Sequence, residues 1–234
     1  MSYQYYSKDH AQEQEFGKVL DNALYVASRG FSGVARNTDI ETQKLGIDIY
    51  FYLNHSYFKC DEKAATSYGV DTSTGKGRVL QTFSFELFTT HSENDHVGKD
   101  GWFLNPDNLS DSYMVTWIDK FHSIPKWEPE LVYFALIRKD SLLRELNKYD
   151  LTVAKMKDKC DRIKQCWADN GYRAYREDSV RRGHLTRFHD KILLRDADDN
   201  GPYLSASTTK GQFHINVVVP RQILNRISVL SGKV

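Results

Sequence analysis

Hydrophobic residues along the chain follow two periods, which predict a helix followed by strands. From Gln12 to about Arg29, apolar residues recur three and four positions apart, as on one face of an amphipathic helix. Gly30 follows this stretch, where a glycine commonly ends a helix. From Leu45 to Leu53, apolar and polar residues alternate, and a second alternating run follows the pair Asn54-His55. Two alternating runs around a two-residue polar turn predict a β-hairpin.

The rest of the chain predicts shorter strands mixed with helices. A glycine-rich loop precedes a strand from Val79 to Phe88, which would complete a three-stranded meander with the hairpin. Further strands are expected at Tyr113–Ile118, Leu131–Ile137 and Phe213–Val219, and helices at Ser141–Asn147, Leu151–Ala168 and from Pro220 to about Leu230. This order predicts an α/β or α+β fold in a single domain, 1–234, with a core over about 11–138 and 202–230. The helical and basic stretch over about 139–200 would be an insertion.

Composition excludes several classes of protein. The chain has 234 residues, of which 40% are hydrophobic, so it is long and apolar enough to bury a core. Lys and Arg number 32 against 31 Asp and Glu, so any binding to a polyanion requires a local patch of charge. Three cysteines are too few, and odd in number, for a disulfide framework. The longest apolar run, Leu131–Ile137, is far short of the ~20 residues that span a bilayer, and the N-terminus lacks a signal-peptide pattern. We therefore expect a cytoplasmic protein with no membrane partner.

The hairpin register places two carboxylates opposite each other. With Leu53 facing Ser56 across the turn, opposed residue numbers sum to 109, so Asp48 faces Asp61. Opposed Cβ atoms lie about 4.5–5.5 Å apart, and like charges so placed destabilise a sheet unless a cation compensates. Lys63 lies on the same face, and two converging carboxylates also suit Mg²⁺. A solvated outer face that happens to carry two Asp and one Lys is the alternative interpretation.

The stretch Gly46-Ile47-Asp48, followed at a hairpin's length by Asp61-Glu62-Lys63, resembles the signature of the PD-(D/E)XK nuclease superfamily. The preceding helix and the strand Ser84–Leu87 are also similar to the restriction-endonuclease-like core of that superfamily. The resemblance implies an N-terminal helix packed with a central mixed β-sheet that contains an antiparallel meander. Ile47 stands where the superfamily name has Pro.

This resemblance implies a role for each residue of the motif. Asp48 and Asp61 would bind a divalent metal through their carboxylates, and Glu62 would bind it through its main-chain carbonyl. Lys63 would position the attacking water and help to neutralise the phosphate. The superfamily often has a glutamate on its first helix that reaches the metal; Glu15 is the candidate here, with Glu13 as the alternative.

The activity implied is hydrolysis of DNA phosphodiester bonds with Mg²⁺, for which Mn²⁺ would substitute. The protein would be an endonuclease of restriction, phage-processing or repair type, encoded by a bacterium or a phage, and a homodimer if both strands are cut. Two alternatives remain open. One is a non-catalytic nucleic-acid-binding or assembly protein on the same scaffold, and the other is an unrelated α/β interaction protein.

Basic residues concentrate in one stretch of this nearly neutral chain, from Gly171 to Arg195. We expect this stretch to contact DNA phosphates, although a solvated arginine-rich loop is the alternative. The expected DNA-contacting residues are Arg173, Arg176, Arg181, Arg182, Arg187 and Lys191.

Three other features have weaker functional interpretations. Glu86 and Ser84 would approach the site only if their strand paired beside Asp61. Trp102 and Trp117 could stack on bases, but core or rim packing is the commoner role of single tryptophans. Cys160 and Cys166, followed by two histidines, loosely imitate a zinc site, yet core packing of Cys160 is the better interpretation. The histidines concerned are His184 and His189.

Overall fold

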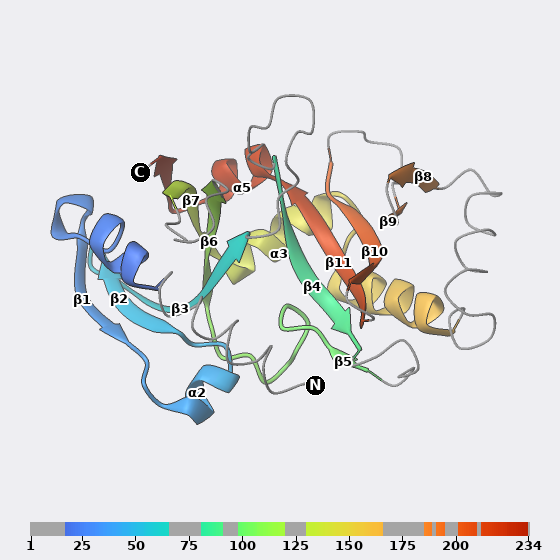
Figure 1. The fold of residues 1–234 in the computed structure, drawn as a ribbon, viewed down its shortest axis with the longest axis horizontal. Coiled ribbons are helices and arrows are strands. Elements are labelled where there is room, and N and C mark those ends of the chain that lie inside the picture. Colours follow the sequence, from blue (N-terminus) through green and yellow to red (C-terminus); the bar gives the residue numbers. More distant parts are fainter. Residues whose placement is uncertain are drawn as a thin grey trace, which may run out of the picture. The chain divides into compact units, whose positions relative to one another are not determined.

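The computed structural model describes residues 17–65, 81–90, 98–119, 130–165, 185–188, 191–194, 201–209 and 212–233 (Figure 1). The chain divides into two compact units, each formed by segments that are distant in sequence. The first unit comprises Met1–Leu80, Leu109–Arg138 and Ser228–Val234. The second unit comprises Gln81–Asn108 and Lys139–Ile227. The fold is α+β, as expected.

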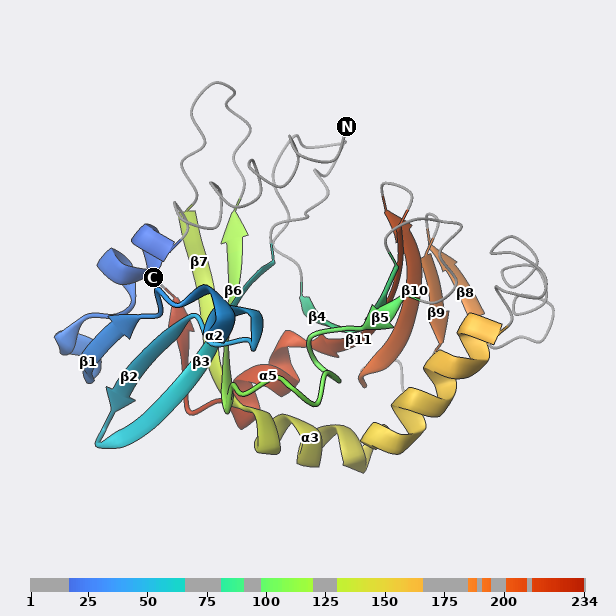
Figure 2. The same cartoon turned by 90° about the horizontal axis from the view of Figure 1, so that it is seen from below.

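A curled, mixed six-stranded sheet forms the first unit (Figure 2). Neighbouring strands are antiparallel except for one central pair, β3 and β6, which is parallel. In spatial order the strands are β1 (Phe31–Arg36), β2 (Ile49–Leu53), β3 (Ser56–Ala65), β6 (Ser112–Asp119), β7 (Glu130–Arg138) and β12 (Leu230–Lys233).

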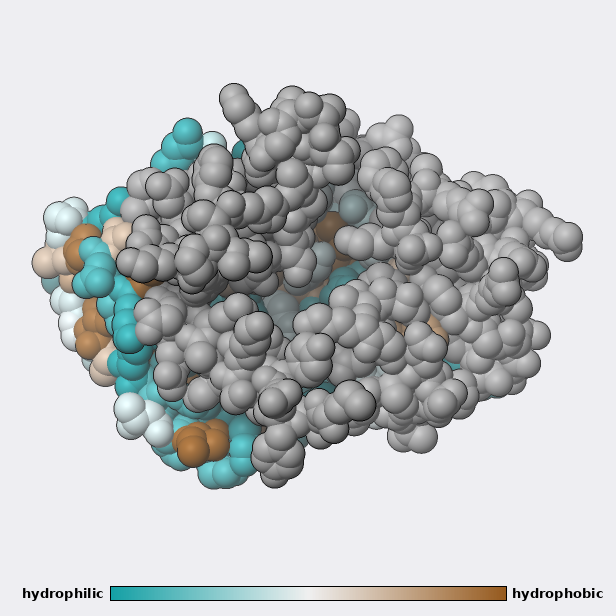
Figure 3. Space-filling model, viewed as in Figure 1, coloured by the Kyte–Doolittle hydropathy of each residue, from teal (hydrophilic) through white to brown (hydrophobic). Residues whose placement is uncertain are grey.

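The hairpin between β2 and β3 has the expected register. Leu53 pairs with Ser56 and Ile49 with Cys60. Asn54 and His55 form the turn with φ values of 49° and 67°, the left-handed conformations that a tight two-residue hairpin turn requires. The short, exposed helix α2 (Ile40–Lys44) connects β1 to β2. On the face shown in Figure 3, the coloured surface over β1 and α2 mixes hydrophilic with hydrophobic patches.

One face of the β2–β3 hairpin lies in the hydrophobic core of the first unit. This core also receives Leu20 from a helix over 17–23 and Leu24 and Tyr25 from the residues directly after it. The 3-10 turn η1 (Ala27–Arg29) follows without a buried residue, and Gly30 ends it at a φ of 85°. Core residues of the hairpin and helix include Ile49, Phe51, Phe58, Cys60, Leu20 and Leu24, all at most 1% exposed. Because a one-residue slip would turn every buried side chain outward, this core fixes the register.

An antiparallel sheet forms the second unit. In spatial order its strands are β5 (Lys99–Asp100), β4 (Thr82–Thr89), β11 (Gln212–Pro220), β10 (Tyr203–Thr209), β9 (Lys191–Leu194) and β8 (Leu185–Phe188). The expected helices are present as α3 (Lys139–Lys148), a helix over 153–165 and α5 (Arg221–Ile227). Within the described residues, no helix is long and apolar enough to cross a membrane.

The prediction that the third strand pairs with the hairpin to complete a meander is wrong. The strand is present as β4, but it pairs with β11 in the second unit, with Phe85 opposite Val217. The apolar face of β11 offers β4 a long ladder, and its side chains bury Phe83, Phe85 and Leu87. The true meander is β1–β2–β3. Its first strand was missed because Gly33 and the polar positions around it weaken the alternating pattern.

Candidate metal centre

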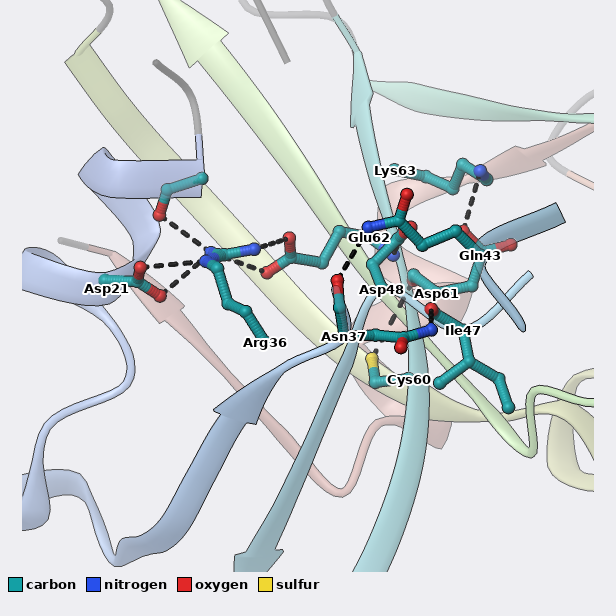
Figure 4. Close-up of polar contacts among 11 residues, drawn as sticks. Asp21, Arg36, Asn37, Gln43, Ile47, Asp48, Cys60, Asp61, Glu62 and Lys63 are labelled. Atoms are coloured by element: carbon teal, nitrogen blue, oxygen red, sulfur yellow. Dashed lines mark hydrogen bonds and ion pairs between the residues drawn. The ribbon is translucent and has the colours of Figure 1, made fainter. Parts of the chain in front are cut away.

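The structure brings the carboxyl groups of Asp48 and Asp61 together (Figure 4). Asp48 directly precedes β2, and its backbone N–H donates to the Cys60 carbonyl at 3.0 Å. This bond continues the hydrogen bonding between the two strands beyond the regular register, in which Cys60 is the partner of Ile49. Asp48 Oδ2 accepts a hydrogen bond of 2.8 Å from the Glu62 N–H. The main chain of β3 therefore orients the Asp48 carboxylate towards the residue that the hairpin register places opposite it.

Asp61 is buried, with 1% of its surface exposed. Lys63, two residues further along β3, places Nζ 2.7 Å from Asp61 Oδ1. Burial raises the pKa of Asp61 to about 7; Lys63 opposes this shift and the neighbouring Asp48 adds to it. The interpretation of this cluster as a fully solvated outer face is therefore wrong, because a carboxylate on such a face would keep its hydration.

Asp61 Oδ2 is buried and meets no hydrogen-bond donor among the described residues. An unsatisfied buried carboxylate oxygen is unfavourable, and a bound cation would stabilise it. Within the described ranges, no group of three or more His, Cys, Asp or Glu side chains is placed to hold a metal. Among the described residues the side chains offer two carboxylates, and the main-chain carbonyl of Glu62, between Asp61 and Lys63 in sequence, is a candidate for a further ligand. Two carboxylates with main-chain and water oxygens fit the preference of Mg²⁺.

The side chain of Glu62 does not join this cluster but contacts Arg36, which lies at the end of β1. Arg36 Nη1 donates to Glu62 Oε2 at 2.7 Å. The same guanidinium makes two hydrogen bonds of 2.8 Å to Asp21 and one to the Gly17 carbonyl, both on the first helix. Burial raises the pKa of Glu62, and Arg36 opposes that shift. Arg36 thus connects the first helix, β1 and the residue between Asp61 and Lys63 (Figure 4).

Sequence reasoning missed this network of Arg36, Asp21 and Glu62. Its members are 15 and 26 residues apart, and no local pattern relates them. The described carboxylate that the first helix directs to this region is Asp21, which is bound by Arg36. Glu15 and its alternative Glu13 lie outside the described residues.

A second set of hydrogen bonds holds the segment before Asp48. Asn37 Nδ2 donates to the Ile47 carbonyl at 2.6 Å, and the Asn37 N–H donates to the Asp48 carbonyl at 2.8 Å. Gln43 Nε2 in turn donates to the Asn37 carbonyl at 2.6 Å. Gly46 has a φ of 81°, a left-handed conformation that glycine adopts without strain. These contacts anchor both sides of the peptide that carries Asp48.

The face of the sheet that carries Asp61 continues into buried residues of β6. Tyr113 pairs with Asp61 and Val115 with Lys63 across the parallel strands, so these side chains project from the same face. Tyr113, Val115 and Trp117 are fully buried. Trp117 is therefore a core residue and cannot stack on a base. Trp102, in the second unit, packs against Phe85 and Phe103.

Several other predicted residues are not placed at this centre. Glu86 lies on β4, and its carboxylate is 3.3 Å from His214 Nδ1 within the second unit. The expectation that its strand pairs beside Asp61 is wrong, because the described neighbours of β3 are β2 and β6. Cys160 is buried, and burial raises the pKa of its thiol to about 12, in agreement with core packing. Cys166, His184 and His189 lie outside the described residues.

The structure describes little of the predicted basic stretch. Arg187 lies on β8 and Lys191 on β9, where only their backbone positions are described. The remaining members of the stretch, Arg173, Arg176, Arg181 and Arg182, fall outside the described residues. Its contact with DNA phosphates remains a prediction.

The candidate centre thus consists of Asp48, Asp61, Lys63 and the main chain of Glu62, held in place by Arg36 and Asn37. Its function is inferred from the chemistry of these groups. Comparisons of the chain with protein-family models, with curated proteins and with solved structures find no match.

Proposed function

We propose that this protein is a divalent-metal-dependent nuclease that hydrolyses DNA phosphodiester bonds. The observation that carries the proposal is the contact between Asp48 and the buried Asp61, with Lys63 at 2.7 Å. We further propose that the chain belongs to the PD-(D/E)XK superfamily. The first helix, the β1–β2–β3 meander and the positions of Asp48 directly before β2 and of Asp61 on β3 support this assignment.

The charges of the cluster fit a divalent ion and a phosphate. Above the pKa of about 7 of Asp61, two carboxylates and one ammonium group leave one net negative charge in a largely buried place, and this charge attracts a cation. A bound divalent cation would reverse the sign and favour a phosphodiester beside it. Mg²⁺ suits the oxygen ligands of Asp48, Asp61 and the Glu62 carbonyl, and Mn²⁺ would substitute.

Each residue of the cluster has a distinct role in the proposed reaction. A bound Mg²⁺ would supply Lewis acidity, which activates water and stabilises charge on the phosphate. Lys63, held next to Asp61, orients a water molecule against the phosphorus and places a positive charge beside the phosphate oxygens. The Glu62 N–H keeps the Asp48 carboxylate directed to the centre. Glu15 is proposed as a further acidic group on the first helix.

The proposal is tested by metal binding and DNA cleavage measured on the same variants. Wild-type protein should bind Mn²⁺ in a calorimetric titration and cut plasmid or single-stranded DNA with Mg²⁺ but not with EDTA. Asp61→Ala should lose both properties. Lys63→Ala should keep the fold and Mn²⁺ binding but lower the cleavage rate about 100-fold or more. Asp107→Ala, which removes an exposed aspartate of the second unit, is the matched control and should behave as wild type.

The outcomes separate the proposal from its alternatives. Mn²⁺ binding that depends on Asp61, without cleavage of any DNA form, would indicate a non-catalytic binding protein. A folded Asp61→Ala variant that binds Mn²⁺ and cuts DNA as well as wild type would place the site elsewhere and overturn the proposal.

A further inference from the structure

Three tyrosines lie on the outer face of the β2–β3 hairpin. Tyr50 and Tyr57 are stacked, with ring centroids 6.3 Å apart and an angle of 9° between the ring planes. Tyr52 and Tyr57 are in contact at 5.2 Å. Tyr52 remains 45% exposed and Tyr57 42% exposed, so both rings present much of their surface to solvent. We call Tyr50, Tyr52 and Tyr57 the tyrosine surface.

The tyrosine surface lies on the same face of the hairpin as the candidate metal centre. Along β3, the side chains of Tyr57, Lys59, Asp61 and Lys63 alternate with those of the core residues Phe58 and Cys60. Asp61 follows Tyr57 by four residue steps along the strand, which corresponds to about 13 Å. The face is exposed at Tyr57 and buried at Asp61. This face of the hairpin is therefore accessible to solvent at the tyrosine surface and buried at the carboxylate of Asp61.

The neighbouring strand β1 leaves room for the outermost ring. Ser32 pairs with Tyr52, and the next residue, Gly33, has a φ of 56° at a bulge between β1 and β2. A Cβ atom at Gly33 would lie 3.1 Å from Tyr52 Cδ2. Glycine at this position therefore lets the ring lie against the backbone of β1, with its outer surface uncovered.

The charges around the tyrosine surface favour an anion. Lys59 is exposed between Tyr57 and Asp61, and no carboxylate of the described residues pairs with it. Asp111, the acidic residue near Tyr57, is neutralised by Arg138 at 3.0 Å. Arg138 also donates to the Tyr57 carbonyl at 3.0 Å, but its guanidinium lies over the ring of the core residue Phe58, on the other face of β3. Lys59 is therefore the cation that lies beside the tyrosine rings. Exposed aromatic rings with adjacent cations are the combination that binds single-stranded nucleic acid.

We propose that the tyrosine surface binds the unpaired bases of a single DNA strand, whose backbone passes Lys59 on its way to Asp48 and Asp61. Exposed rings stack on bases only when those bases have left the duplex, so the occupant is single-stranded DNA. This inference rests on the proposed nuclease function and adds the form of its substrate.

The test is equilibrium binding of a labelled 15-nucleotide oligothymidine, measured by fluorescence anisotropy in EDTA so that no cleavage occurs. Tyr52→Ala and Tyr57→Ala should each weaken binding about fivefold or more, because each removes a stacking partner. Tyr52→Phe and Tyr57→Phe keep the rings and should bind as wild type. Ile40→Ala, which removes an exposed apolar side chain from α2, is the control and should have no effect.

Two further probes separate stacking from charge. An abasic oligonucleotide of the same length keeps the phosphates, so the Tyr→Ala variants and wild type should bind it equally. Lys59→Gln should weaken binding to both oligonucleotides and reduce the salt dependence. A duplex of the same length should bind the Tyr→Ala variants and wild type with equal affinity.

The result that would overturn the proposal is a wild-type protein that does not bind the oligothymidine, or folded Tyr→Ala variants that bind it unchanged. Mn²⁺ titration of the same proteins distinguishes this failure from failure of the nuclease proposal. The tyrosine variants should keep Mn²⁺ binding. If the wild-type protein binds the oligonucleotide through the tyrosine rings but does not bind Mn²⁺, the proposed role of the tyrosine surface stands. The proposed nuclease function is then wrong.

Discussion

Asp48 and Asp61 carry like charges in contact, and only part of this repulsion is offset by a cation. Lys63 pairs with Asp61 Oδ1, while Oδ2 has no donor among the described residues. When both carboxyls are ionised, above the pKa of about 7 of Asp61, their repulsion is therefore unfavourable for the fold. A site that binds a cation has this property because the ion completes the charge balance that the protein leaves open.

Asp48→Asn should stabilise the metal-free protein. The asparagine oxygen can still accept the Glu62 N–H, while the amide group removes the like charge and offers a donor to Asp61. We expect the free energy of unfolding in EDTA at pH 8 to rise by about 1 kcal/mol. Urea denaturation measures this change, with Asp107→Asn as the control. A less stable variant would show that repulsion between the two carboxylates is not significant.

At the scale of secondary-structure elements, polar contacts fix how helices attach to their sheets. Arg36 attaches the first helix to β1 and β3 through Asp21 and Glu62. In the second unit, Glu145 of α3 is 3% exposed and pairs with Lys148 of the same helix at 2.7 Å and with Arg226 of α5. Each acidic group thus joins elements that are remote in sequence.

Glu145→Gln should destabilise the second unit by about 1–2 kcal/mol at pH 7, because the charged hydrogen bonds to Lys148 and Arg226 are lost. Lys148 and Arg226 hold the pKa of Glu145 below its ordinary value of 4.5. As pH falls, the carboxylate of Glu145 is therefore protonated at a higher pH in the unfolded state than in the folded state. The stability from this group is present above about pH 4.5 and is lost as pH falls through the lowered pKa.

The measurement is thermal or urea unfolding of wild type and Glu145→Gln between pH 7 and pH 3. The difference in stability should shrink towards the acidic end. Asp140→Asn, in the first turn of α3 and exposed, serves as the control. A difference that stays constant over this range would show that the ionised form of Glu145 is not the source of the effect.

At the scale of the whole molecule, the chain passes between its two units after residues 80, 108, 138 and 227. The sheet of the first unit begins with β1 and ends with β12, almost 200 residues later. β12 covers the edge of β7, with Leu230 paired to Leu136 and Ser231 to Ala135. The two units therefore cannot be separated as continuous pieces of chain.

Truncation after Ile227 should destabilise the first unit and promote association. It would expose the backbone of β7 as an unpaired edge, which is a template for pairing with another chain. We expect a lower melting temperature and a shift to larger species in size-exclusion chromatography. Gly232→Ala is the control, because a Cβ there would meet Phe134 at an ordinary contact distance of 3.5 Å. A truncated protein with the same size in solution and the same stability as wild type would refute this role of β12.

The sequence by itself determined the hairpin register from Leu53–Ser56 to Ile49–Cys60, and an extension of that register by one step predicted that Asp48 lies near Asp61. A two-residue turn fixes which residues oppose each other, and the period of two fixes their faces, so both follow from local positions. The helices that carry a regular apolar stripe, such as that over 153–165, were predicted for the same reason.

Only the tertiary structure decided the strand neighbours, the burial of Asp61 and the Arg36 network. The residue pattern of β4 is compatible with pairing beside β3 or beside another strand. In the structure β4 pairs with β11, whose apolar face lies more than 100 residues later in the chain. Tyr113 and Val115 on β6 project from the face that carries Asp61, and this part of the face is buried. These outcomes depend on which distant surfaces exclude water from each other, and a local pattern of residues does not encode that contact.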